Sequence, residues 1–190
     1  MKNCLNIKDN LKFAQLSGDY NKIHIEQKFA KKFFFKYCVA HGINIIALSL
    51  SKFLKRNCNN NFFIKELDIK FYNLIEVGEK FIINVFNNKI TVKNDINDKL
   101  EIKIKYKKFR KKYKLNESIT LKDKEYYFDN LLNKDLINEL MKLSKNIGSR
   151  LFGDGSLFLK INIHIQNNGK KKCIIDKINK NAFNCYLSSK

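Results

Sequence analysis

Three side chains that can move protons lie close together near the start of the chain. Asp19 precedes His24 by five positions, and His41 follows next to Gly42. A carboxylate beside an imidazole suits general acid–base catalysis, in which each positioned group contributes about 10² to 10⁴ in rate. The chain has only three histidines, and two of them lie here. This stretch is therefore the first candidate for a site.

Short helices are predicted to carry these groups. Apolar residues at helical spacing predict one helix with Asp9 as its N-cap and Gly18 as its left-handed stop. Its C-terminal end would then deliver Asp19. Residues 21–24 are predicted to form a turn or tight loop, and residues 26–34 a second short helix.

A long buried helix is predicted to begin at Gly42 and to end at Asn57. Its apolar residues recur every three or four positions, which is the spacing of one helix face. The first turn of a helix has N–H groups without intrahelical acceptors and a positive dipole end. The Gly42 N–H could therefore polarise a carbonyl, and losing such a donor typically costs about 10² to 10³ in rate. The apolar positions are Ile43, Ile46, Ala47, Leu50, Phe53 and Leu54.

Alternating apolar residues after this helix predict an antiparallel sheet and an α+β fold. Asn87 and Asn88 separate two of the strands and indicate a hairpin. Four strands are predicted, over residues 63–71, 80–86, 89–93 and 100–106.

The C-terminal part repeats this order of a helix followed by strands. Leu67 and Ile69 find counterparts in Ile161 and Ile163, an offset of 94 residues, and the two helices lie at nearly the same offset. We interpret this as a degenerate internal repeat, while a coincidence between two ordinary α+β segments remains the alternative. The elements predicted here are strands in 117–123 and 124–129, a helix over 131–151, a turn at 153–155, and strands over 157–165, 173–178 and 182–188.

The composition is that of a globular chain with a strong positive charge. Of 190 residues, 44% are hydrophobic, which is enough for a core, and the net charge is +20. Lysines are spread over the chain, and the one dense basic run is Lys107 to Lys114. A solvated strand end explains that run better than nucleic-acid binding, which remains a third hypothesis. A basic surface also suits an acidic carrier protein or the phosphates of coenzyme A.

The five cysteines form no CxxC pair, so neither a zinc site nor a disulfide framework is predicted. The N-terminus lacks a signal-type apolar run, and the longest apolar run, 43–50, is too short to span a bilayer. We expect a reduced, cytoplasmic protein without a membrane span.

The stretch from Phe13 to Gly42 resembles the hydratase signature of the MaoC-like dehydratases, which include the (R)-specific enoyl-CoA hydratases. That signature reads roughly F-A-x-x-S-G-D-x-N-P-[IL]-H, with A-H-G later in the chain. The resemblance is close over the first third of the chain, and the order of elements extends it to about Tyr106. The matching residues are Phe13, Ala14, Ser17, Gly18, Asp19, Asn21, Ile23, His24, Ala30, Ala40, His41 and Gly42.

This resemblance implies a hot-dog fold, in which an antiparallel sheet wraps a long central helix. It implies reversible addition of water across the 2,3 double bond of an enoyl-CoA or enoyl-carrier-protein thioester, with no metal or organic cofactor. Asp19 would take a proton from water, and His24 would orient the water or donate a proton at the α-carbon. Gly42, His41 and Asn21 would contact the substrate. From the residues alone, His41 serves equally well to fix the helix entry, and Asn21 is better explained as a residue that shapes the loop than as a catalyst.

The chain departs from the signature at Lys22, where the family usually has proline, and before Gly42, where the usual Gly and Pro residues are missing. The second repeat has no D…H pair and no HG at its helix start. We therefore predict a double hot-dog with a catalytic unit over 1–112 and a degenerate unit without catalytic residues over 113–190. It would be a pseudo-dimeric monomer, or otherwise a homodimer through exposed sheet edges. The alternative function is a non-catalytic thioester-binding module or a structural partner subunit.

Overall fold

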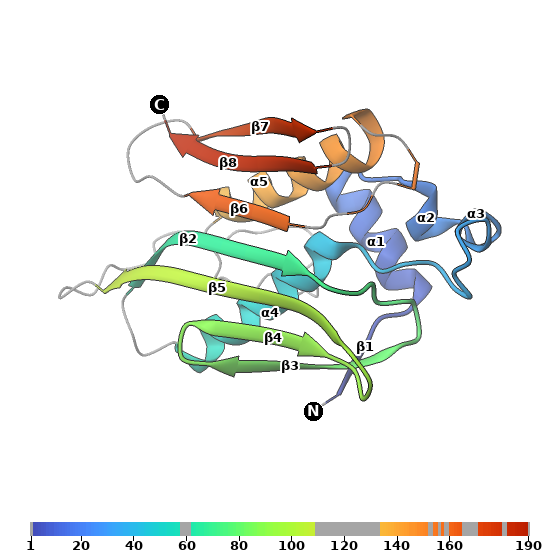
Figure 1. Cartoon of the computed structure of the whole chain (residues 1–190), viewed down its shortest axis with the longest axis horizontal. Coiled ribbons are helices and arrows are strands. Elements are labelled where there is room, and N and C mark those ends of the chain that lie inside the picture. Colours follow the sequence, from blue (N-terminus) through green and yellow to red (C-terminus); the bar gives the residue numbers. More distant parts are fainter. Residues whose placement is uncertain are drawn as a thin grey trace.

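A six-stranded antiparallel sheet covers one side of the long helix α4 (Gly42–Arg56) in the computed structural model of this chain (Figure 1). The structure describes residues 2–57, 62–108, 134–151, 154–155, 157, 160–164, 171–179 and 182–189. The predicted sheet wrapped on a central helix is confirmed. In spatial order the strands are β1 (Asn3–Cys4), β3 (Lys80–Phe86), β4 (Lys89–Lys93), β5 (Asp98–Lys108), β2 (Phe62–Phe71) and β6 (Lys160–His164).

Helix α4 begins at Gly42 as predicted, and Asn57 is its C-cap. Its side chains are buried on most sides because the helix lies between the sheet and the other helices. Leu50 and Ile46 are fully enclosed, and burying a side chain of this size contributes about 1.5–3 kcal/mol. The strands supply the opposite wall of this core, since buried and exposed residues alternate along β3 and β4.

Helix α1 (Ile7–Ser17) corrects the predicted N-cap. Asn6, not Asp9, is the cap residue, and its side chain accepts hydrogen bonds from the N–H groups of Lys8 and Asp9. Asp9 stands three positions further on and accepts the N–H of Asn6, which completes a capping box. The C-terminal prediction is confirmed, because Gly18 is left-handed with φ +73° and donates its N–H to the Ala14 carbonyl.

Two very short helices follow. The predicted turn at 21–24 is instead a single helical turn, α2 (Lys22–Ile25), because the Asn21 side chain caps it through the N–H of Ile23. Helix α3 (Gln27–Lys31) is shorter than the predicted range 26–34. Phe34 has φ +64°, a left-handed backbone conformation that cannot be part of a right-handed α-helix.

The C-terminal part adds α5 (Lys134–Lys145), a π-helical turn η1 (Asn146–Leu151), β6, and a separate hairpin of β7 (Lys171–Asn179) and β8 (Ala182–Ser189). Helix α5 lies beside α1 and α4 (Figure 1). Its buried residues share one hydrophobic core with those of α4 and the sheet. The strand predictions for 117–123 and 124–129, and the basic run beyond Lys108, fall outside the described residues.

Strand β6 pairs with β2 in a register that bears on the predicted repeat. Asp68 lies opposite Asn162, 94 positions further along the chain, with Leu67 opposite Ile163. This is the pairing expected if β2 meets its own counterpart across a local two-fold axis. The division into units 1–112 and 113–190 remains a prediction.

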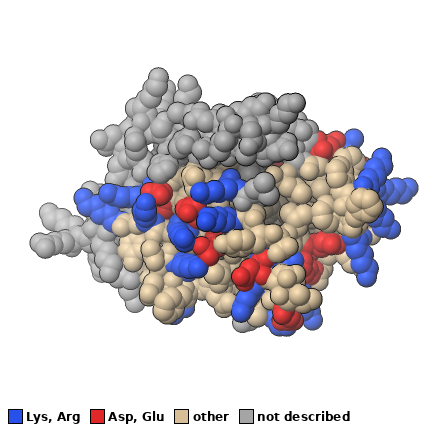
Figure 2. All heavy atoms as spheres, viewed as in Figure 1, with Lys and Arg blue, Asp and Glu red and all other residues tan. Residues whose placement is uncertain are grey.

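The described surface of the sheet mixes both signs of charge. Figure 2 shows lysines and arginines interleaved with acids over the sheet rather than gathered into one continuous basic stripe. Lys89 pairs with Glu101 and Lys105 with Glu66 on this surface. Nucleic-acid binding uses a basic patch or stripe, which the described part of this face does not form. None of the described helices is both long and apolar enough to cross a membrane.

Candidate active site

The left-handed turn at Gly18 directs Asp19 into the interior, where its side chain is 2% exposed. One carboxylate oxygen, Oδ1, accepts the N–H of Asn21 at 3.2 Å. The Asn21 side chain in turn accepts the N–H of Ile23 and begins the helical turn that carries His24. Local hydrogen bonds therefore set the separation of Asp19 and His24. The part of Asn21 in substrate binding remains a prediction.

His24 is held through both its ring and its own backbone carbonyl. Its Nδ1 lies 2.8 Å from the carbonyl oxygen of Val39. Because a carbonyl only accepts, Nδ1 carries the proton and Nε2 keeps its lone pair. The buried amide of Asn10 donates to the carbonyls of both His24 and Val39, at 2.8 and 2.9 Å. Sequence reasoning missed Asn10, which lies on the buried face of α1 with Phe13, Ala14 and Ser17.

His41 packs on His24 and ties the start of α4 to Asp19. The two imidazoles are stacked with their centroids 3.9 Å apart. The Nε2–H of His41 donates to the backbone carbonyl of Asp19 at 3.1 Å, and its ring is fully buried. This contact agrees with a residue that fixes the helix entry. Its contact with a substrate remains a prediction.

Burial lowers the pKa of both imidazoles and so favours their neutral forms. Desolvation lowers the pKa of His24, while the charge of Asp19 and the Val39 carbonyl act in the opposite direction. The pKa of His41 lies well below its usual range, first because of burial and then because of the neighbouring His24. A neutral His24 can therefore accept a hydrogen bond from water through Nε2 at neutral pH.

We expect acid to destabilise the protein through these two histidines. Both pKa values are lower in the folded chain than the ordinary 6.5, so the unfolded chain binds more protons as pH falls below about 6.5. The free energy of unfolding should drop from there until the folded pKa values are passed, by about 1.4 kcal/mol for each unit of depression. Urea unfolding between pH 7.5 and 5.0 measures the slope. His41→Gln should flatten it, and an unchanged slope would contradict this origin.

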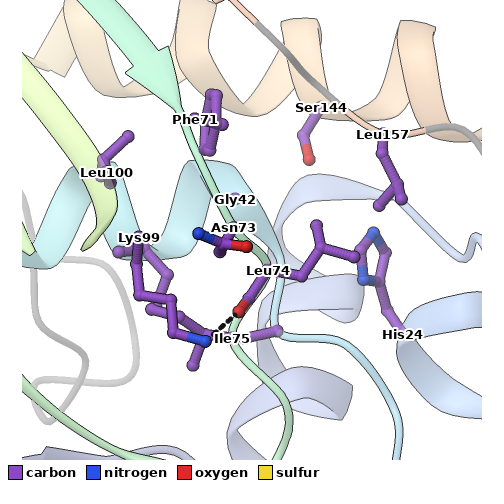
Figure 3. A pocket seen from close by; sticks show the side chains of 12 residues that line it. His24, Gly42, Phe71, Asn73, Leu74, Ile75, Lys99, Leu100, Ser144 and Leu157 are labelled. Carbon is purple, nitrogen blue, oxygen red and sulfur yellow. Dashed lines mark hydrogen bonds between the residues drawn. The ribbon is translucent and has the colours of Figure 1, made fainter. Parts of the chain in front are cut away.

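A small pocket opens between His24 and the start of α4. Its walls include His24, Gly42, Ser144, Phe71, Leu74 and Leu157 (Figure 3). It offers about 30 Å³, which is room for about two water molecules. Asp19 is not among the residues that line it, whereas Ser144 from α5 is. The structure thus brings His24 and Gly42 to one pocket and sets Asp19 behind its wall.

Lys99 is a buried cation at the far side of this pocket. Its ammonium lies 2.7 Å from the Leu74 carbonyl oxygen (Figure 3) and 2.7 Å from a carboxylate oxygen of Glu79. A buried charge is tolerated when it is paired and hydrogen-bonded in this way. The Lys99 ammonium meets this condition through Glu79 and the Leu74 carbonyl.

Residues of the C-terminal part close over the Asp19 carboxylate, and the sequence analysis did not find them. The hydroxyl of Ser144 donates to Oδ2 of Asp19 at 2.6 Å. Gly148 lies one helical turn further on, and a Cβ at this position would come within 2.8 Å of Asp19 Cγ and Oδ2. No local motif signals these contacts. The helical spacing of 144 and 148 is the one available clue.

The turn at Asp154 and Gly155 holds the loop between Asp19 and His24. Asp154 Oδ1 accepts the backbone N–H of Lys22 at 3.1 Å, and its other oxygen lies 3.5 Å from the Lys22 ammonium. The Gly155 N–H donates to Asn21 Oδ1 at 2.9 Å. A proline at position 22 would lack the N–H that Asp154 accepts. Lys22, which replaces the proline of the family signature, therefore makes a hydrogen bond to Asp154 that proline could not make.

Lys22→Pro should both restrict the unfolded chain and remove the hydrogen bond to Asp154. Lys22 is the first residue of α2, a position where proline is tolerated and reduces the freedom of the unfolded chain. In an Asp154→Ala background we expect a gain of about 0.4–1 kcal/mol in the free energy of unfolding. In the native background the lost hydrogen bond should cancel or reverse that gain. Chemical denaturation of the four proteins measures both changes. Equal gains in the two backgrounds would show that the Asp154 contact contributes nothing.

The same three side chains are also candidates for metal ligands. Asp19, His24 and His41 each offer a ligand atom, all within 4.8 Å of one another. Histidine nitrogens bind a metal in the plane of the ring at about 2.0–2.1 Å. The planes of the two rings are only 30° apart and stacked, so their lone pairs run side by side rather than converge. Both Asp19 oxygens also accept hydrogen bonds already. The arrangement suits proton transfer better than metal coordination.

The family model described as "MaoC like domain" matches residues 4–108, which is more than half of the chain. The chain belongs to the MaoC-like domain family. The match ends before α5, so Ser144, Gly148 and Asp154 lie outside the MaoC-like range. Within that range lie Asp19, His24 and Gly42, all three of which the structure places at or directly behind the pocket.

Solved structures with a similar fold include MaoC-like proteins and hydratases. A MaoC-like dehydratase shows 10% identity over 55% of this chain, with a TM-score of 0.46, and the chain covers 38% of that longer protein. An (R)-hydratase from A. caviae involved in PHA biosynthesis shows 15% identity over 56% of this chain and 90% of its own length, with a TM-score of 0.46. An R-hydratase from Pseudomonas aeruginosa shows 15% identity over 63% and 88%, with a TM-score of 0.42. No curated protein sequence matches the chain. Family membership rests on the family model alone.

Proposed function

We propose that this chain is a hydro-lyase that adds water to, or removes it from, the 2,3 double bond of an acyl thioester. Membership of the MaoC-like family supports a hydratase role in general. The observation that carries the specific proposal is the joint burial of Asp19 and His24 beside the free start of α4. The substrate is an enoyl-CoA or enoyl-carrier-protein thioester, and the proposed chemistry uses no metal or organic cofactor.

The proposed reaction differs from the roles expected from the sequence, in which Asp19 takes the proton from water. Here His24 contacts the water, because it lines the pocket and Asp19 does not. The oxygen of water adds to C3 while its proton passes to Nε2 of neutral His24, which then returns this proton to C2. Asp19 stabilises the imidazolium that forms between these steps. The negative charge that builds on the thioester oxygen is met by the Gly42 N–H, which has no intrahelical acceptor. Dehydration runs through the same groups in reverse.

A second candidate is a non-catalytic thioester-binding module or structural partner subunit. The small pocket favours it, because about 30 Å³ holds water but no acyl chain. The apolar walls formed by Phe71, Leu74 and Leu157 would have to move for a substrate to enter. On this reading the Asp19 and His24 cluster would be a stabilising network only.

A direct assay separates these candidates. The purified chain is mixed with crotonyl-CoA, with a longer enoyl-CoA and with an enoyl-carrier protein, all in the presence of a chelator. Loss of absorbance of the conjugated enoyl thioester reports hydration. Turnover with any of the three supports the hydro-lyase. Binding by calorimetry without turnover supports the thioester-binding module. If the chain shows neither binding nor turnover, the structural partner subunit is the remaining candidate.

A further inference from the structure

A serine from the C-terminal part completes the hydrogen bonding of Asp19. Ser144 lies 125 positions from Asp19, yet its Oγ is 2.6 Å from the carboxylate oxygen Oδ2. Both residues are buried, with 1% and 2% of their surface exposed. This length is that of a charge-assisted O–H···O⁻ bond, which is roughly twice as strong as a neutral one.

The Asp19 carboxylate also accepts a hydrogen bond from its own loop. Its donor is the Asn21 N–H, 3.2 Å from Oδ1. A buried carboxylate without hydrogen bonds is strongly disfavoured, so the shorter Ser144 bond carries much of its stabilisation. The two bonds act on different oxygens, and together they set the rotation of the carboxyl group.

The end of α5 and the turn η1 after it bring the Ser144 hydroxyl close to the Asp19 carboxyl group. Ser144 lies near the end of α5 and Gly148 in the turn η1 that follows it, and both positions lie against the Asp19 carboxyl group. Gly148 leaves space where a Cβ would overlap the Asp19 carboxyl group. Ser144 also lines the pocket, as His24 does (Figure 3). One oxygen of the serine thus connects the pocket wall to the carboxylate behind it.

We propose that Ser144 is a positioning residue for Asp19, which makes the C-terminal part a required component of the catalytic site. This proposal rests on the hydro-lyase function above. It differs from the prediction made from the sequence, in which residues 113–190 are structural only. Ser144 holds the carboxylate in the orientation that supports proton uptake by His24.

Three substitutions at this position test the proposal in the full-length chain. Ser144→Ala and Ser144→Val remove the hydroxyl, while Ser144→Thr keeps it with the same added bulk as valine. We expect kcat for enoyl-CoA hydration to fall roughly 10- to 100-fold in the alanine and valine variants, with KM within about twofold. Threonine should recover most of kcat. Similar kcat values for valine and threonine, or a change confined to KM, would overturn the proposal.

Ser49→Ala is the matched control. Ser49 is a fully buried serine of α4 whose hydroxyl has no hydrogen-bond partner among the described residues. Its replacement should leave kcat unchanged. A loss of kcat equal to that of Ser144→Ala would mean that any buried serine has this effect.

A measurement without turnover keeps the two proposals separate. The ¹³C chemical shift of the Asp19 carboxyl at pH 7 reports the hydrogen bond in each folded variant. We expect wild type and Ser144→Thr to agree and Ser144→Val to differ. If the wild type shows no hydration, the hydro-lyase proposal fails while this shift still tests the contact. Identical shifts in the threonine and valine variants would reject the role of Ser144.

Discussion

Asp19→Asn should lower kcat for hydration by about 10²- to 10⁴-fold while the chain stays folded. Asparagine has almost the same shape and keeps one oxygen to accept a hydrogen bond, but it removes the negative charge. That charge raises the pKa of His24 against the effect of burial. Without it, proton uptake by the imidazole becomes less favourable in the step that needs it.

Single-turnover kinetics with crotonyl-CoA measure this loss directly. Asp95→Asn is the matched control, because it makes the same chemical change at an exposed acid that pairs with Lys2. The control should keep full activity. A turnover of Asp19→Asn within about threefold of wild type would remove Asp19 from the reaction, since catalytic acid–base groups contribute far more.

Gly148→Ala should damage both stability and activity through one side chain. The new methyl group would lie 2.7 Å from Asp19 Cγ, closer than atoms pack without movement. Overpacking of this kind typically costs about 1–3 kcal/mol in the free energy of unfolding. The carboxyl group must shift to relieve it, and a misplacement near 1 Å is expected to reduce kcat by about 10².

A double-mutant cycle identifies the cause of that loss. In an Asp19→Ala background the carboxyl group is gone, so Gly148→Ala should cost much less stability than in the native background. Urea unfolding of the four proteins gives the coupling free energy. Equal costs in both backgrounds would show that the methyl group meets other atoms and that η1 does not pack on Asp19 as described.

Two different parts of the chain contribute to the proposed site. The MaoC-like match ends at residue 108, yet contacts from 144 to 155 hold both Asp19 and the loop around Lys22. The register of β2 with β6, in which Asp68 meets Asn162, supports the hypothesis that the two parts derive from one repeated unit. Such a repeat would have exchanged catalytic residues in its second copy for positioning contacts.

Local sequence patterns were sufficient for most elements. The start of α4 at Gly42, the left-handed stop at Gly18 and the hairpin at Asn87 and Asn88 are confirmed. Each depends on residues within a few positions, such as a conformation open to glycine or a period of two or 3.6. Asn6 and Asp9 show the limit of this reasoning, because both types make good N-caps and only the backbone geometry chooses between them. The two-residue strand β1 is too short to show any alternation.

The residues of the site also fall into those that the sequence predicted and those that it did not. Asp19, His24 and His41 lie within 23 positions, so short connections and the signature around them predicted their proximity. Asn10, Ser144, Gly148 and Asp154 carry no such signal, because a period reports which face is buried and not which distant side chain it meets. The amino-acid sequence alone thus determined which groups can do chemistry and the elements that carry them. Only the packing of α5 and its following turn against α1 and α2 decided that the carboxylate is held from a distant part of the chain.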